Sequence, residues 1–152
     1  MNHVDKQLAY LVLRLALGVN MFIHGVGRLG GNYEKFVAGT VGQFAASPLP
    51  ALSVSIFGHI IPFLETVIGL LLVLGFATRF VSVIGGLVMV SLIFGMGILQ
   101  KWDIVGIQMV YILFYFLLLF LIEWNRYSVD GWLEKIASIP KATPARSAPR
   151  LP

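Results

Sequence analysis

Four long runs of apolar residues alternate with short polar segments along the chain. The runs cover residues 8–27, 52–76, 80–99 and 105–123. Each is long enough to cross a bilayer, which takes about 20 mostly apolar residues. Only residues 77–79 separate the second run from the third, and only residues near 101–103 separate the third from the fourth. Because connections this short join antiparallel neighbours, the pattern predicts an all-α integral membrane protein, an antiparallel four-helix bundle.

A shorter helix is predicted in the loop after the first run. One face at helical spacing carries Tyr33, Phe36, Val37, Thr40, Val41 and Phe44. Asn32 is placed to cap this helix, and the Ser-Pro-Leu-Pro segment at 47–50 ends it. We expect a short amphipathic helix at the outer membrane surface, which either anchors the loop or covers a site beneath it as a lid.

The fourth run is followed by aromatic residues and a basic tail. Trp124, Tyr127 and Trp132 are typical of the aromatic belt at a membrane surface. The stretch 134–152 is rich in Pro, Ala, Ser and basic residues, and we expect most of it to be disordered. The predicted organisation is therefore a membrane domain at 1–133 and a basic, Pro-rich cytoplasmic tail at 134–152.

The composition agrees with a lipid environment. Hydrophobic residues make up 58% of the 152 residues and charged residues 12%, and the mean hydropathy is +0.88. Soluble domains carry about 25% charged residues. The chain has no cysteine, which excludes disulfides, thiol redox chemistry and cysteine-ligated metal clusters within it.

Basic residues are unequally divided between the two sides of the predicted bundle. The side with both termini carries Lys6, Arg79, Arg126, Lys135, Lys141, Arg146 and Arg150. The other side carries Arg28, Lys35 and Lys101. Cytoplasmic loops are enriched in basic residues, so we expect a multi-pass protein of a bacterial inner (cell) membrane with both termini in the cytoplasm. No basic motif interleaved with aromatic residues indicates a nucleic-acid partner.

Two ionisable side chains, Arg14 and Glu65, fall near the middle of predicted spans. A charge at the centre of a membrane helix costs about 2.5–3.5 kcal/mol on insertion scales. The predicted depths of the two residues agree to within a turn or two, so we predict that Glu65 pairs with Arg14, which would remove two uncompensated charges. Such a pair either only holds the bundle together or forms part of a ligand site.

Further polar side chains gather in the outer half of the predicted bundle and favour a pocket that opens outward. The candidate ligand-binding residues are Arg14, His24, Arg28, His59, Glu65, Gln108 and Tyr111. Each also has a structural interpretation, since the histidines can bond to backbone carbonyls and Tyr111 can pack in the core. The histidines could ligate haem or another metal, but no third ligand accompanies them at metal spacing, so we predict no metal site.

These residues lie in segments that resemble the DoxX family of small four-helix membrane proteins. The matching segments are "LVLRLALGVNMFIHGVGRL" at 11–29, "FLETVIGLLLVLGFATR" at 63–79 and "NRYSVDGWL" at 125–133. The family pattern corresponds to Arg14, His24-Gly25, Arg28 (where lysine is commoner), Glu65, Gly69, Gly75, Arg79, Tyr127, Ser128 and Asp130. The resemblance covers roughly residues 8–133.

The family takes its name from a subunit of a thiosulfate:quinone oxidoreductase. The resemblance therefore implies a membrane subunit of a redox system that binds a small anion, a quinone or both, with Arg14, His24 and Arg28 suited to a dianion. No cofactor site is visible in the chain, so a membrane quinone would be a substrate and a partner subunit would carry the thiol or redox cofactor. The alternative is a non-enzymatic structural or solute-handling protein in which the Arg14–Glu65 pair only fixes the bundle. A homo-oligomer is compatible with either.

Overall fold

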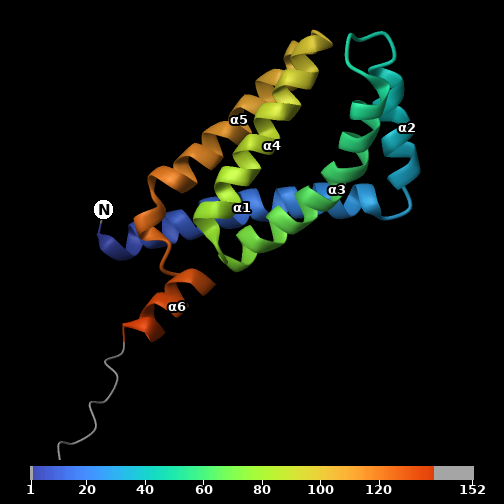
Figure 1. Cartoon of the computed structure of the whole chain (residues 1–152). Coiled ribbons are helices and arrows are strands. Elements are labelled where there is room, and N and C mark those ends of the chain that lie inside the picture. The colour runs from blue at the N-terminus through green and yellow to red at the C-terminus, as the bar shows by residue number, and fades with distance from the viewer. Residues whose placement is uncertain (1, 139–152) are drawn as a thin grey trace, which may run out of the picture.

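The computed structural model describes residues 2–138, which form six α-helices and, within that range, no β-strand (Figure 1). Four helices are long and apolar enough to cross a membrane: α1 (His3–Leu29), α3 (Ala51–Leu74), α4 (Thr78–Ile98) and α5 (Trp102–Phe120). The shorter elements are α2 (Tyr33–Gln43), the 3₁₀ turn η1 (Ile122–Trp124) and α6 (Val129–Ala137). The predicted all-α fold is confirmed. Of the predicted tail, residues 139–152 lie outside the described residues.

The four long helices form two antiparallel pairs. One pair is α1 with α3, and the other is α4 with α5. The pairs meet at the end that carries the N-terminus and α6, here called the terminal end, and diverge toward the end that carries α2, here called the α2 end (Figure 1). α5 also contacts α1. The hydroxyl of Tyr10 donates to the carbonyl of Leu118 at 3.0 Å, and the hydroxyl of Tyr111 donates to the side-chain oxygen of Asn20 at 3.2 Å.

Glycines set the separation of α1 and α3. A Cβ atom added to Gly69 would lie 2.2 Å from the backbone nitrogen of Phe22, and one added to Gly25 would lie 2.3 Å from the hydroxyl oxygen of Thr66. No larger residue fits at either position without moving a helix. Lipid supplies no hydrophobic force between helices, so this close van der Waals contact is what favours their association.

α3 changes direction along its length (Figure 1). Pro62 lies inside the helix. Its ring lacks an N–H group and clashes with the carbonyl of residue 58, which bends helices at such positions. The N-terminal part of α3 leaves α1 and packs against α2, and it lines a cavity together with the last turns of α4.

α2 has the predicted amphipathic pattern. Every residue of the face from Tyr33 to Phe44 is buried or partly buried, and Val37 and Phe44 are the most buried. The other residues of α2 are exposed. Asn32 occupies the N-cap position, as predicted, but its side chain makes no capping hydrogen bond.

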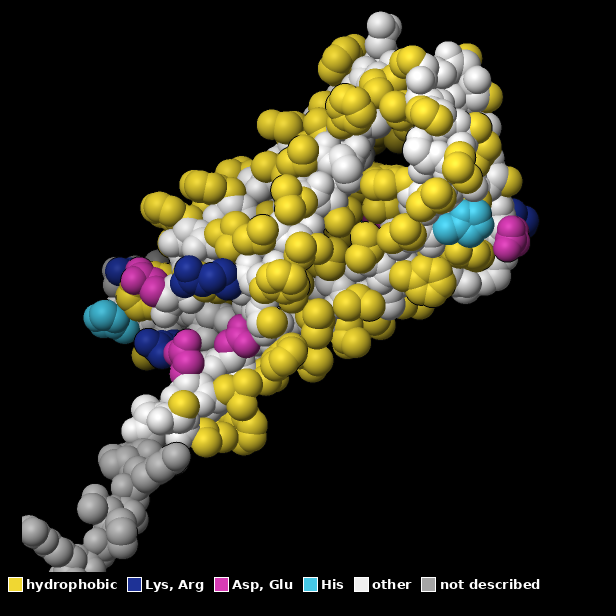
Figure 2. All heavy atoms as spheres, in the orientation of Figure 1, with side chains coloured by type: hydrophobic (Ala, Val, Ile, Leu, Met, Phe, Trp, Pro, Cys, Tyr) yellow, Lys and Arg dark blue, Asp and Glu magenta, His cyan; other side chains and the backbone are white. Residues whose placement is uncertain are grey.

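The long helices keep large apolar side chains on their outer surface. Val12, Phe80 and Phe120 are 66%, 69% and 70% exposed. On the face shown in Figure 2, hydrophobic side chains cover the middle of the molecule, and charged side chains gather at the terminal end and beside α2. An apolar belt between two charged ends is the surface expected of a protein that spans a bilayer.

Replacing Gly69 by alanine is expected to separate α1 from α3. The added methyl group would overlap the backbone of Phe22, and overpacking of this kind costs about 1–3 kcal/mol or more. Gly97→Ala is the matched control, because a Cβ atom there meets nothing within 4 Å. Unfolding in mixed detergent micelles measures both variants. Equal stability of the two would contradict the close α1–α3 contact.

The basic residues predict that the terminal end faces the cytoplasm. Because the chain has no cysteine, single-cysteine variants report the orientation without interference. Ser47→Cys, before α3 at the α2 end, should react with an impermeant maleimide added to intact cells. Ser138→Cys, directly after α6, should react only after permeabilisation. The opposite pattern would reverse the orientation.

Candidate functional site

The predicted ion pair between Arg14 and Glu65 is wrong. Glu65 pairs with Arg28, whose Nη1 donates to its carboxylate. Arg14 donates instead to the backbone carbonyls of Leu72 and Val73, the latter at 2.9 Å. Both charges have partners, but the partners differ from the predicted ones.

The register of α1 against α3 explains the correction. Gly25 lies against Thr66, so the level of Glu65 on α3 corresponds to the last turns of α1, where Arg28 lies. Arg14 precedes Gly25 by about three helical turns. It therefore lies beside the C-terminal end of α3, near Gly75, and cannot reach Glu65.

Arg14 binds the carbonyl end of α3. Its side chain is 2% exposed, and besides the two carbonyls of α3 it donates from Nη2 to the carbonyl of Tyr127 at 2.8 Å. The last carbonyls of a helix lack partners within the helix and carry a partial negative charge. A guanidinium placed there is stabilised without a carboxylate.

Asp130 binds the N–H groups at the start of α4, as Arg14 binds the carbonyl groups at the end of α3. Its carboxylate accepts hydrogen bonds from the N–H groups of Ala77 at 2.7 Å and Thr78 at 2.8 Å. Its own N–H donates to the carbonyl of Gly75 at 3.0 Å. Asn125 adds a bond from its amide nitrogen to the hydroxyl of Thr78 at 2.9 Å. Residues far apart in the sequence thus hold the turn between α3 and α4. We call this turn, together with Arg14, Asn125 and Asp130, the terminal polar network.

A cavity of about 550 Å³ lies at the α2 end, bounded by α2, α3, α4, α5 and the end of α1. Figure 2 shows a hollow among the apolar side chains near this end. Its wall is mainly apolar and aromatic. The polar side chains that line it include Arg28, Lys35, Gln43, Ser53, Ser91 and Gln108. We call it the α2 cavity.

Arg28 connects the α2 cavity with the interior of the helix pair. Its side chain is 29% exposed, whereas that of Glu65 is only 4% exposed. The guanidinium carbon lies 4.7 Å from the ring centroid of Phe36 on α2, a cation–π contact. Because Glu65 neutralises Arg28, Lys35 is the cation in the cavity wall that forms no ion pair within residues 2–138.

The remaining predicted site residues lie in different surroundings. Gln108 lines the α2 cavity, and its buried Oε1 has no hydrogen-bond partner in the described chain. Tyr111 is bonded to Asn20 between α5 and α1. His24 is exposed on α1, within electrostatic range of Glu65.

His59 is placed away from the α2 cavity. Its ring nitrogen lies 2.7 Å from the carbonyl of Ser55, and its ring packs edge-on against Tyr33. The structure therefore pairs Arg28 with Glu65 and places Arg28 and Gln108 in the wall of one cavity, whereas Arg14 and His59 lie outside that wall. Within residues 2–138, no three His, Asp or Glu side chains are grouped so as to hold a metal ion.

Sequence reasoning missed the contribution of α2 to the cavity wall. Lys35, Phe36 and Gln43 line the cavity, although the sequence showed only that one face of this helix is apolar. The one indication of this role was the interpretation of the loop helix as a lid over a site beneath it. The cavity itself follows from the bend at Pro62 and the divergence of the helix pairs, and no local pattern shows either.

The four spans and the apolar belt define an integral, multi-pass membrane protein. A family model, DoxX, matches residues 9–102, which include all of α2, α3 and α4 and most of α1. The chain belongs to the DoxX family. Comparisons with curated proteins and with solved structures gave no match. The segment with Asn125 and Asp130 follows the matched region.

Removing Arg28 tests the corrected pairing. Arg28→Met leaves the buried Glu65 carboxylate without its partner, and loss of one partner of a buried pair costs about 3–5 kcal/mol. The double variant Arg28→Met/Glu65→Leu should recover most of this stability. The Arg14→Met variant should be destabilised too, but adding Glu65→Leu should not rescue it. Denaturation in detergent micelles measures all four. Rescue of Arg14→Met by Glu65→Leu would restore the pairing predicted from sequence.

Proposed function

We propose that this DoxX family protein is the membrane subunit of a quinone-linked redox system and binds the quinone head group in the α2 cavity. The lining of the cavity carries the proposal. Its volume of about 550 Å³ falls in the range of small-molecule sites, about 300–1,000 Å³, which are mostly apolar with a few placed polar groups.

The wall suits a flat ring with two carbonyl oxygens. Phe36, Phe44 and Phe57 supply aromatic surface, and stacked or edge-on contacts between rings are favourable. Arg28 and Lys35 can donate to a carbonyl oxygen and stabilise the negative charge that develops there on reduction. An isoprenoid tail would leave into lipid between the diverging helix pairs.

A small dianion such as thiosulfate fits the α2 cavity less well. Glu65 already neutralises Arg28, and a charge buried in an apolar wall is costly unless it is fully paired. Lys35 alone would leave most of the dianion without partners. We therefore assign the quinone to this cavity, and the electron donor to a partner subunit that carries a thiol or another redox group.

A second candidate is a non-enzymatic structural or solute-handling protein. One observation favours it: both charges inside the spans have partners within the chain, since Glu65 pairs with Arg28 and both Nη atoms of Arg14 donate to backbone carbonyls. Neither has to remain free for a ligand. Under this candidate the pair that fixes the bundle is Arg28–Glu65, and filling the α2 cavity would have no effect on quinone binding.

Filling the α2 cavity separates the two candidates. Gly39 and Gly42 both lie on α2, and a Cβ atom at either meets nothing within 4 Å, but only Gly39 lines the cavity. Menadione and decylubiquinone should raise the unfolding temperature of the unaltered protein and of Gly42→Leu. Gly39→Leu should weaken their binding by about tenfold or more, equivalent to about 1.4 kcal/mol.

Thiosulfate is the comparison ligand and should not stabilise the protein. Absence of any response of the unaltered protein to the quinones would exclude quinone binding. A response equal in both leucine variants would place the quinone outside the α2 cavity.

A further inference from the structure

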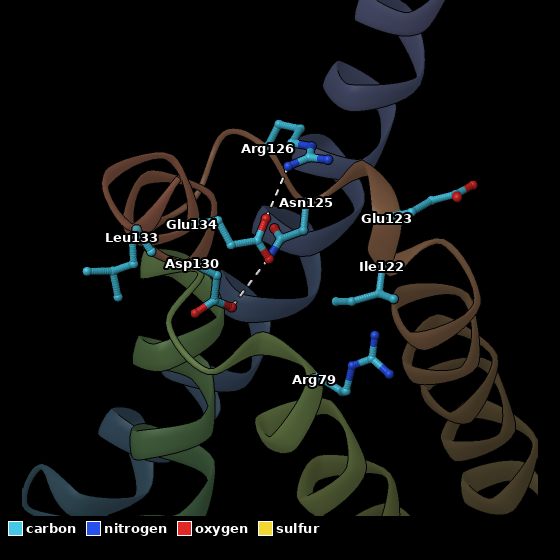
Figure 3. A pocket seen from close by; sticks show the side chains of 9 residues that line it. Arg79, Ile122, Glu123, Asn125, Arg126, Asp130, Leu133 and Glu134 are labelled. Atoms are coloured by element: carbon cyan, nitrogen blue, oxygen red, sulfur yellow. Dashed lines mark hydrogen bonds and ion pairs between the residues drawn. The ribbon is translucent and has the colours of Figure 1, made fainter. Parts of the chain in front are cut away.

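A second cavity lies at the terminal end, between η1, α6 and the first turn of α4 (Figure 3). Its volume is about 570 Å³. We call it the terminal cleft. It lies at the opposite end of the molecule from the α2 cavity, and neither the quinone proposal nor the Arg28–Glu65 pair involves it.

The terminal cleft has a cationic side and an acceptor side. Arg79 extends from α4 toward Ile122, and Asn125, Asp130 and Glu134 lie across from it (Figure 3). Within residues 2–138, Arg79 forms no hydrogen bond or ion pair. Its guanidinium is therefore available to an anionic group at the membrane surface.

The acceptor side contains an unsatisfied buried atom. Asn125 is 9% exposed, and its amide nitrogen donates to Thr78. Its Oδ1 is buried and accepts no hydrogen bond in the described chain. A buried acceptor without a donor is costly. The neighbouring Glu134 is 70% exposed and is held only by Arg126 at 3.1 Å, so a ligand with an N–H donor can approach this side.

An apolar groove continues the terminal cleft along α4. Arg79 and Asp130 line both, and the groove is otherwise lined by residues that include Phe80 and Val83. Phe80 and Val83 are 69% and 44% exposed on the outer surface of this span. A polar site at the end of a span thus opens onto the surface that faces lipid.

We propose that the terminal cleft binds the head group of a phospholipid with a primary ammonium group. The phosphate lies on Arg79, and the ammonium group donates to Oδ1 of Asn125 and to the carboxylate of Glu134. One acyl chain lies in the groove along Phe80 and Val83. A ligand with both charges matches a lining that holds two cations, Arg79 and Arg126, and three carboxylates, Glu123, Asp130 and Glu134. A simple anion would meet this excess of carboxylates.

Lipid titration of the full chain in detergent, followed by native mass spectrometry, tests the head group. Phosphatidylethanolamine should bind about tenfold or more tightly than phosphatidylcholine with the same acyl chains, because a trimethylammonium group has no N–H donor. Phosphatidylglycerol should also bind more weakly than phosphatidylethanolamine. Equal binding of the three lipids would overturn the proposal.

Arg79→Gln should lower the affinity for phosphatidylethanolamine by about tenfold. The control Lys101→Gln, which removes a cation from the opposite end of the molecule, should not change it. An equal loss in both variants would show attraction by overall charge and would overturn the assigned site. Circular dichroism verifies the fold, which Arg79 does not support through any hydrogen bond or ion pair within residues 2–138.

A second pair of variants tests the groove, and two soluble phosphate compounds test the source of the phosphate. Val83→Trp fills the groove, and Val90→Trp places the same ring two turns away on the exposed surface of α4. Only Val83→Trp should weaken binding of phosphatidylethanolamine. Inorganic phosphate and phosphoethanolamine, which lack acyl chains, should fail to displace it at equal concentration. Displacement by either would identify a soluble phosphate site and overturn the lipid assignment.

Discussion

The turn between α3 and α4 is held by two opposite charges, and the arrangement of the other helices depends on it. Arg14 binds the carbonyl end of α3, and Asp130 binds the N–H end of α4. Helix ends near lipid cannot leave these backbone groups unpaired. Because Arg14 belongs to α1 and Asp130 to α6, the same hydrogen bonds attach the first helix and the last one to this turn.

Attachment at the terminal end leaves the α2 end free to open. Close contact at Gly69 and Gly25 keeps α1 on α3, while Pro62 directs the first part of α3 toward α2. The α4–α5 pair diverges from this layer, and the α2 cavity lies in the resulting space. Arg28 lies in its wall, and because Glu65 neutralises it, this charge is compatible with a largely apolar wall.

The two cavities differ in chemistry because they lie at different parts of the fold. The α2 cavity lies between diverging spans, and its aromatic wall favours a lipid-soluble ring. The terminal cleft lies where spans end and η1 and α6 begin, and Arg79 and Asn125 give it two polar sides. The proposals of a quinone and of a phospholipid head group therefore rest on separate residues.

The sequence by itself determined the four spans, the short connections between the last three and the buried face of α2, because these follow from periodicity and length. It also showed that Arg14 and Glu65 need partners within the membrane. It could not identify those partners, since a period of 3.6 residues shows which face of a helix is buried but not its axial position against a neighbour. The contacts of Gly25 and Gly69 set that position. Only the tertiary structure therefore decided that Arg28 pairs with Glu65, that Arg14 binds the end of α3, and that a cavity forms at the α2 end.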